Sequence, residues 1–399
     1  GATDTSVEVG LRTRQALEGG VPVASSAVAI TADAVTRLLA RSIAGSGGLL
    51  SGAASSARIE DTGRAWVRLA DGSGSANRAA IVANRIDVQA HYRSLYGLHA
   101  NAINASAVGA SGTDAEFANA NAWRTSGASV DVGRHALLSA VQGIGLASLA
   151  AVDRVAGTAD PNDREAPYVA SGAGGGLASG AAVLARQTLR HQASTRVGDD
   201  ARVETVGDPY YQPGDVRISA RTTSDADFRV KLNTGGAIQA PFTEAHTDLD
   251  STVSASLGQR SRVLSSGGFS LVTSVDHRAL SEALTKTYGA IGIAGGESDT
   301  RLVARERVTV GADATIYAWG SAHIGAGMAT DGSAANLLGA RAITDVYNYA
   351  LIPITPTLRA NGWAINDAQV VLHAGSDVRA VRDVSLRAAQ GLSDARVQA

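Results

Sequence analysis

Apolar and polar residues alternate along most of the chain, and in its second half the alternation returns at a fixed interval. The returning phrases are Gly214–Arg221 (GDVRISAR), Gly267–Ser274 (GGFSLVTS) and Gly320–Gly327 (GSAHIGAG). Their first large apolar positions, Val216, Phe269 and Ala322, are 53 residues apart in both intervals. Strict alternation is typical of a half-buried strand, and a strand unit that recurs at a long period indicates a stacked array. The pattern therefore predicts a solenoid.

A second phrase precedes the repeat strands and sets a shorter spacing. It reads VGDDARV at Val197–Val203, LGQRSRV at Leu257–Val263, VGADATI at Val310–Ile316 and LHAGSDV at Leu372–Val378. Apolar anchors thus fall six residues apart at Leu257, Val263 and Phe269. A strand of about three residues plus a tight corner fills each interval, so three sides close a turn of roughly 18 residues. We therefore predict an all-β, single-stranded parallel β-helix of roughly 20 rungs; the alternative is an antiparallel β-sandwich, which does not usually show such long self-similarity.

More distant copies extend the array in both directions. They are Ile86/Val88/Ala90, Ala136/Leu138/Ala140 and Val384/Leu386/Ala388. Irregular intervals between them indicate insertions, so we expect one elongated domain over 1–399, irregular in 1–170 and clearer in 170–399. About 22 turns at strand spacing would form a rod of about 100 Å. One segment, Thr31–Ala44 (TADAVTRLLARSIA), also has near-helical spacing and is compatible with a local helix.

Composition supports a narrow interior. The chain has 45 Gly, 8 Pro and no Cys, and is 45% hydrophobic but only 4% aromatic. A globular core of this size would normally use more rings, whereas ladders of Ala, Val, Ile and Leu fill a thin solenoid. The net charge is −2, with 35 basic and 37 acidic residues interspersed, so we expect no nucleic-acid partner. No apolar run reaches the roughly 18 residues of a membrane span, and Ala170–Ala185 comes nearest.

The start of the chain and its lack of cysteine give a weak indication of origin. It begins at Gly1, without Met or a signal peptide, which suggests a processed product or a piece of something longer. The absence of cysteine fits a large secreted or surface protein, and it also fits a cytosolic one.

One cluster has the residue types of a catalytic site. His246, Asp248 and Asp250 (HTDLD) alternate, so a strand would place all three on one face. Carboxylate clusters on one long face are the usual catalytic groups of β-helical polysaccharide lyases and hydrolases. A solvated outer face is the competing interpretation. We therefore keep these residues as catalytic candidates only and expect no metal site and no cofactor.

The loop Gly207–Gly214 (GDPYYQPG) interrupts a repeat and places Tyr210 and Tyr211 between two prolines. Exposed tyrosines suit protein or sugar contacts, because they combine flat apolar area with a polar tip. Packing of the loop over a rung edge is the alternative. A second charged loop, Asp160–Tyr168 (DPNDREAPY), is also expected to project.

The phrase VGxxAxV followed by GDVxIxA resembles the repeats of very large bacterial exoproteins, the filamentous-haemagglutinin-like and leukotoxin-type filamentous adhesins. The glycine-rich tract Ala170–Gly198 also resembles their inter-strand segments. The resemblance is good over 170–399 and looser before. It implies a right-handed β-helical stalk that is exported and displayed at the cell surface. The amino-terminal secretion module of such adhesins is absent from this sequence, and their Asn ladders are sparse.

These observations favour a structural role: a rod or stalk segment of a bacterial surface filament or adhesin, secreted or at the cell surface. Exposed strand edges at the terminal rungs would recruit further strands, so we expect self-association or a larger parent chain. One alternative is an adhesin that binds a surface glycan or protein through loop 207–214. The other is a polysaccharide-active enzyme that uses His246, Asp248 and Asp250.

Overall fold

The computed structural model describes residues 4–9, 17–18, 21–22, 27–74, 78–120, 125–155 and 168–399. In these ranges the protein is all-β, with 81% strand and no helix. The strands are β1 (Asp4–Val9), β2 (Leu17–Glu18), β3 (Val21–Pro22), β4 (Ala27–Glu60), β5 (Arg64–Leu69), β6 (Ala79–Ala118), β7 (Ser126–Val132), β8 (Ala136–Arg154), β9 (Ala170–Val197), β10 (Arg202–Thr205), β11 (Asp215–Leu257), β12 (Arg262–Ser265), β13 (Phe269–Ile293), β14 (Gly295–Val310), β15 (Thr315–Ala318), β16 (Ala322–Ala326), β17 (Leu337–Ile354), β18 (Leu358–Leu372), β19 (Asp377–Ala380), β20 (Val384–Ala388) and β21 (Leu392–Gln398). Nineteen strands form one sheet with parallel pairing, and β2 and β3 form a separate antiparallel pair.

The 53-residue interval is one turn of the solenoid, which corrects the prediction of three turns of 18. Val216 pairs directly with Phe269, and Phe269 with Ala322. The complete ladder has seven positions, Val28, Ile86, Ile144, Val216, Phe269, Ala322 and Val384. Roughly 20 rungs and a 100 Å rod are therefore wrong for this chain. Six intervals of about 4.8 Å give a stack only about 29 Å tall.

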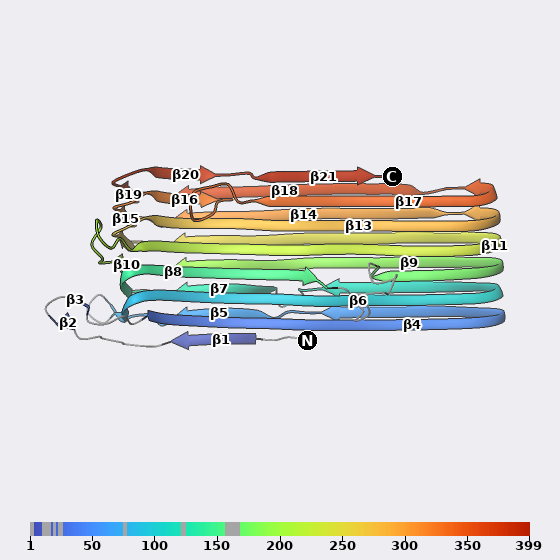
Figure 1. The fold of residues 1–399 in the computed structure, drawn as a ribbon, viewed down its shortest axis with the longest axis horizontal. Helices are drawn as coiled ribbons and strands as arrows, with labels where there is room; N and C mark the ends of the chain where they lie inside the picture. Colours follow the sequence, from blue (N-terminus) through green and yellow to red (C-terminus); the bar gives the residue numbers. More distant parts are fainter. Residues whose placement is uncertain are drawn as a thin grey trace.

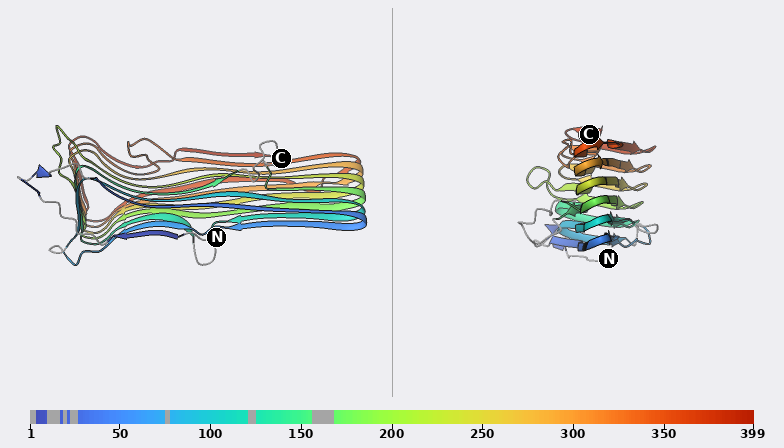
Figure 2. Two further views of the ribbon diagram at one scale, coloured as in Figure 1. Left: turned by 60° about the horizontal axis from the view of Figure 1, so that its bottom comes forward. Right: turned by 90° about the vertical axis from the view of Figure 1, so that its right-hand side faces the viewer.

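Each rung consists of a triangular end and a long, flat arm (Figures 1 and 2). In one rung, β13 runs outward, the chain reverses at Gly289–Ile291, and β14 returns to a corner that leads into the short strand β15. The predicted six-residue spacing describes the triangular end correctly. There Leu257, Val263 and Phe269 point inward from three sides and are at most 2% exposed.

Small and polar side chains fill much of the arm, unlike the apolar triangular end, although the arm also buries a few rings such as Tyr96, Phe117 and Phe228. Hydroxyl groups meet across its interior: Thr243 and Thr285 are 2.7 Å apart, and Ser298 and Thr344 also 2.7 Å. These hydroxyl groups satisfy one another within the protein. Small residues let the two sheets of the arm approach closely, so the arm needs few large apolar residues.

The phrase VGxxAxV forms one corner of the triangle. Its fourth position has left-handed backbone geometry in successive rungs; these residues are Asp200, Arg260, Asp313 and Gly375, with His135 in the rung before. Asp and His tolerate this conformation better than most residues. Stacking favours glycine at the second position of the covered rungs, because a Cβ on Gly311 would lie 2.6 Å from a backbone carbon of Gly258. The last rung has His373 at this position.

Two local assignments differ from expectation. Ala136–Ala140 lies on the short side, where Leu138 pairs with Val203, and it is not a copy of the repeat strand. Residues 31–44 belong to β4 rather than to a helix, because they pair in register with β6. Their apolar residues at helical spacing, Val35 and Leu39, face outward and are 63% and 59% exposed.

Candidate functional site

The loop after β10 is held open by a short polar network. The Asp208 carboxylate accepts hydrogen bonds from the backbone amides of Tyr210 (2.8 Å) and Tyr211 (3.2 Å). At its base, the Thr205 hydroxyl donates to the Gly214 carbonyl at 2.7 Å. Glycine is needed at that point, since a Cβ on Gly214 would lie 2.6 Å from the Val141 carbonyl oxygen. The loop is therefore a defined projection, as the prolines and glycines of the sequence predict.

The loop brings aromatic rings from two rungs together. Tyr210 and Tyr211 are 80% and 90% exposed. The Tyr210 ring lies edge-on to Trp319, with ring centroids 6.0 Å apart, and Trp319 lies edge-on to Tyr317 at 6.2 Å. Trp319 follows β15 and is 38% exposed, so the cluster forms a surface at the triangular end. We call Tyr210, Tyr211, Tyr317 and Trp319 the aromatic cluster.

A groove of about 600 Å³ lies on the same short side. Its lining includes Arg78, Arg202, Arg260, Arg262, Asp200 and Asp313. Arg260 donates two hydrogen bonds of 2.8 Å to Asp200, and this contact lowers the pKa of the Asp200 carboxyl. Arg202 and Arg262 are direct ladder partners, so two like charges stand one rung apart. The groove therefore carries an excess of positive charge beside the aromatic cluster.

The amino-acid sequence alone indicated only part of the aromatic cluster. Tyr210 and Tyr211 were evident because their loop breaks the repeat, whereas Tyr317 and Trp319 belong to an ordinary rung. Only the stacking of β10, β12 and β15 brings them close to the loop. The second predicted loop is Asp160–Tyr168, and its residues 160–167 lie outside the described residues.

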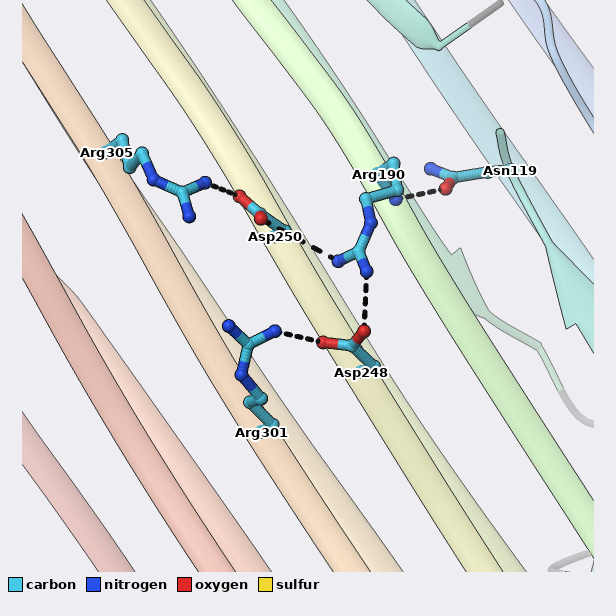
Figure 3. A network of polar contacts seen from close by, with 6 residues as sticks. All are labelled: Asn119, Arg190, Asp248, Asp250, Arg301 and Arg305. Carbon is cyan, nitrogen blue, oxygen red and sulfur yellow. Dashed lines mark hydrogen bonds and ion pairs between the residues drawn. The ribbon is translucent and has the colours of Figure 1, made fainter. Parts of the chain in front are cut away.

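The catalytic candidates His246, Asp248 and Asp250 do lie on one outer face, on the returning half of β11. Figure 3 shows Asp248 and Asp250 with their arginine partners. Asp248 bridges two neighbouring rungs: one oxygen accepts from Arg190 at 2.6 Å and the other from Arg301 at 2.9 Å. Asp250 is paired with Arg305. His246 lies 3.9 Å from the Asp299 carboxylate. Asp248 and Asp250 therefore belong to a ladder of ion pairs along the stack, and His246 lies beside it.

The ion-pair ladder changes the titration of its central carboxyl. Burial acts to raise the pKa of Asp248, but hydrogen bonds and charge from Arg190 and Arg301 outweigh burial and hold the pKa below its ordinary value. A carboxylate whose two oxygens are both engaged by guanidinium groups is stabilised as an anion. This arrangement suits cross-linking of rungs better than proton transfer.

No group of three or more His, Asp or Glu side chains in the described part of the chain is placed to hold a metal ion. No helix in that part is long and apolar enough to cross a membrane. Searches of family models, of curated proteins and of solved structures found no match to this chain.

Proposed function

We propose that this protein is a structural β-solenoid segment of a bacterial surface filament or large adhesin, exported and displayed at the cell surface. The proposal includes the right-handed winding that the sequence resemblance implies, and end-to-end stacking through the terminal rungs. The observation that carries it is the parallel ladder that joins every described rung to the next, with a register shift between Ala83 and Arg85, and whose last rung has the same inward pattern as the covered ones. Backbone pairing along the whole stack makes such a unit stiff.

The long arm of each rung means that the unit adds more width than length to a filament. One rung advances the stack by about 4.8 Å, whereas the roughly 20 residues from Phe269 to Gly289 reach about 65 Å sideways. The unit therefore contributes lateral surface more than length.

The terminal rung is suited to receive another one. Its inward residues Val384 and Leu386 are 45% and 48% exposed, whereas their partners in the previous rung are fully buried. The side-chain amide of Asn366 has both polar atoms buried without a partner. An added rung would cover the apolar residues and supply partners for the amide and the open backbone edge.

We expect concentration-dependent association of the purified chain, measured by sedimentation velocity and seen as stacks by electron microscopy. Leu372→Asp with Leu386→Asp places charges on the inward face of the terminal rung and should abolish stacking. Gln369→Asp with Ser385→Asp adds the same charges to its outward face and should leave stacking intact. A chain that stays monomeric at all concentrations, or equal behaviour of the two variants, contradicts the proposal.

A second candidate function, ligand binding at the triangular end, is favoured by the aromatic cluster beside the arginine groove. Flat rings and guanidinium groups together fit an acidic polysaccharide, through ring stacking and paired anions. Electrophoresis through gels with alginate should retard the protein, and gels with neutral dextran should not.

The variants Tyr211→Ala and Trp319→Ala should remove this retardation. Tyr288→Ala, an exposed tyrosine outside the cluster, is the matched control and should behave as the unmodified protein. Equal migration in both gels would exclude this second function for acidic glycans.

A further inference from the structure

An apolar ridge runs along the tips of the arms. We define the tips as residues 48–50, 106–108, 176–178, 236–238, 289–291 and 350–352, where each rung reverses (Figure 1, right; Figure 2). Leu50, Val108, Ala178, Ile238, Ile291 and Ile352 are successive ladder partners at this edge. The residue before each of them is Leu or Ala. The tips thus repeat an apolar pair in all six described rungs.

The ridge is exposed in the middle of the stack as well as at its ends. Leu177 is 68% exposed and Ile238 is 49% exposed, although each of them has a neighbouring rung on both sides. Leu49 and Leu351, in the outer rungs, are 79% and 87% exposed. A contiguous apolar surface of this kind marks an interaction site.

The tips have polar groups inside and apolar groups outside, the reverse of a solvated turn. The Asn104 amide donates at 3.0 Å to the carbonyls of both Ser51 and Ala110. Asn348 donates at 2.8 Å to the Gly292 carbonyl, and Gln239 donates at 3.3 Å to the Gly176 carbonyl. Inward amides thus satisfy backbone carbonyls at the arch. Such internal pairing is what a backbone requires where water is scarce.

Charge is absent from the tips, and on the outgoing strands of three rungs the first charged residue behind the ridge is a cation. No charged residue occurs between Arg41 and Arg58, or between Lys231 and Glu244. The chain contains two lysines, Lys231 and Lys286, which precede Gly236 and Gly289 by five and three residues. On the same outgoing strands the nearest charged residue is Arg41 in the first rung and the anion Asp345 in the last one, whereas His99, the ladder partner of Arg41, is buried. The three cations Arg41, Lys231 and Lys286 therefore lie about 10 to 23 Å behind the ridge along the strands.

Tyr288 and its ladder partner Tyr349 lie between the ridge and Lys286, and Tyr347 lies at the level of Lys286. Tyr288 stacks on Tyr349 with ring centroids 5.0 Å apart, and Tyr349 lies parallel to Tyr347 at 6.3 Å. The Lys286 ammonium lies 5.3 Å from the centroid of the Tyr347 ring. Apolar tip, tyrosine and lysine in that order match the layers of a membrane interface, from acyl chains to headgroups.

We propose that the arm tips dock edge-on to a lipid bilayer that contains anionic lipids, with the ridge inserted about 5–10 Å into the interface. A second copy of the chain is less suited. The ridge is convex and only one arch wide, so a rigid partner would need a matching groove, whereas lipid conforms to its shape. This docking uses a different surface from the end-to-end stacking proposed above and does not depend on it.

The test is flotation of the full chain with vesicles of phosphatidylcholine containing 30% phosphatidylglycerol, compared with phosphatidylcholine alone. We expect binding to the anionic vesicles and weaker binding to the neutral ones. Leu49→Asp/Leu177→Asp/Leu351→Asp should lower the partition coefficient at least tenfold. The control Val35→Asp/Val206→Asp/Val381→Asp adds the same charge at exposed positions away from the tips, and should change it less than twofold.

The lysines give an independent readout. Lys231→Gln with Lys286→Gln should weaken binding to anionic vesicles about tenfold and reduce its dependence on salt, leaving binding to neutral vesicles unchanged. The proposal is overturned if the protein does not float with either vesicle, or if the tip variant floats like the unmodified chain. It is also overturned if sedimentation without lipid shows a dimer that the tip variant abolishes and no flotation occurs, since the ridge would then bind a second copy. End-to-end stacking should be unaffected by all these variants, so its failure would be seen separately.

Discussion

Replacing Gly236 by alanine is expected to lower the free energy of unfolding by on the order of 3 kcal/mol. Gly236 stands at an arm tip, with a φ of 151° that side chains rarely adopt. A Cβ there would lie 1.7 Å from the Gly176 carbonyl oxygen of the neighbouring rung. Because that atom belongs to the backbone of a stacked arch, the collision displaces both tips and weakens the hydrogen bonds between them.

The adjacent glycine provides the matched control. A Cβ on Gly235 would meet no atom within 4 Å. Gly235→Ala should therefore leave the free energy of unfolding within about 1 kcal/mol, and a small gain is expected because alanine restricts the unfolded chain. Urea unfolding followed by far-ultraviolet circular dichroism measures both variants. Similar midpoints for Gly235→Ala and Gly236→Ala would show that the tips are not packed as closely as the structure places them.

Lowering the pH is expected to destabilise the protein already at pH values above those at which carboxylates become protonated. His191 and His277 are 1% and 0% exposed inside the arm, and their rings lie 5.2 Å apart. His277 is surrounded by hydroxyls, with Nε2 2.8 Å from Ser251 Oγ and Nδ1 2.9 Å from Ser224 Oγ. Burial lowers the pKa of His191 to about 4, and burial together with the His191 charge lowers that of His277 well below its ordinary value.

The sign of the effect follows from these directions. The unfolded chain binds protons at these histidines near pH 6.5, whereas the folded chain keeps them neutral. Stability is therefore fully present above pH 6.5 and falls as the pH decreases toward 4, by on the order of 3 kcal/mol for His191 alone. Glu306 opposes this trend, because its burial raises its pKa and favours proton uptake by the folded state.

Unfolding free energies measured between pH 7 and 5 should show this loss. The double variant His191→Asn/His277→Asn should flatten the slope even where it lowers stability at neutral pH. His373→Asn, at an exposed corner, should keep the slope of the unmodified protein. An unchanged slope in the double variant would mean that other groups cause the acid sensitivity.

The extent to which the sequence predicted the fold depended on the part of the rung. At the triangular end, anchors such as Leu257, Val263 and Phe269 are large, apolar and evenly spaced, so three sides could be deduced. In the arm the same alternation continues, but Ser, Thr and Ala fill the interior. The alternation of apolar and polar residues shows on which face of a strand a residue lies, but it does not show where the strand ends. The two long strands of an arm therefore have the same sequence pattern as several short strands.

The candidate sites show the same limit. Tyr210 and Tyr211 were visible because they break the repeat, and His246, Asp248 and Asp250 because they alternate. Trp319 beneath the loop, and Arg190 and Arg301 on either side of Asp248, could not be predicted. They come from other rungs, and their proximity depends on the register between rungs.

The sequence by itself thus determined the all-β class, the inward face of the repeat strands and the 53-residue repeat, since these follow from local alternation and spacing. Only the tertiary structure decided that the repeat is a single turn with a long arm. The turn closes where residues such as Val216 and Phe269 pair, and pairing between distant strands is a property of the packed stack. The apolar ridge at the tips became visible only then, because it consists of pairs of residues brought together from six rungs.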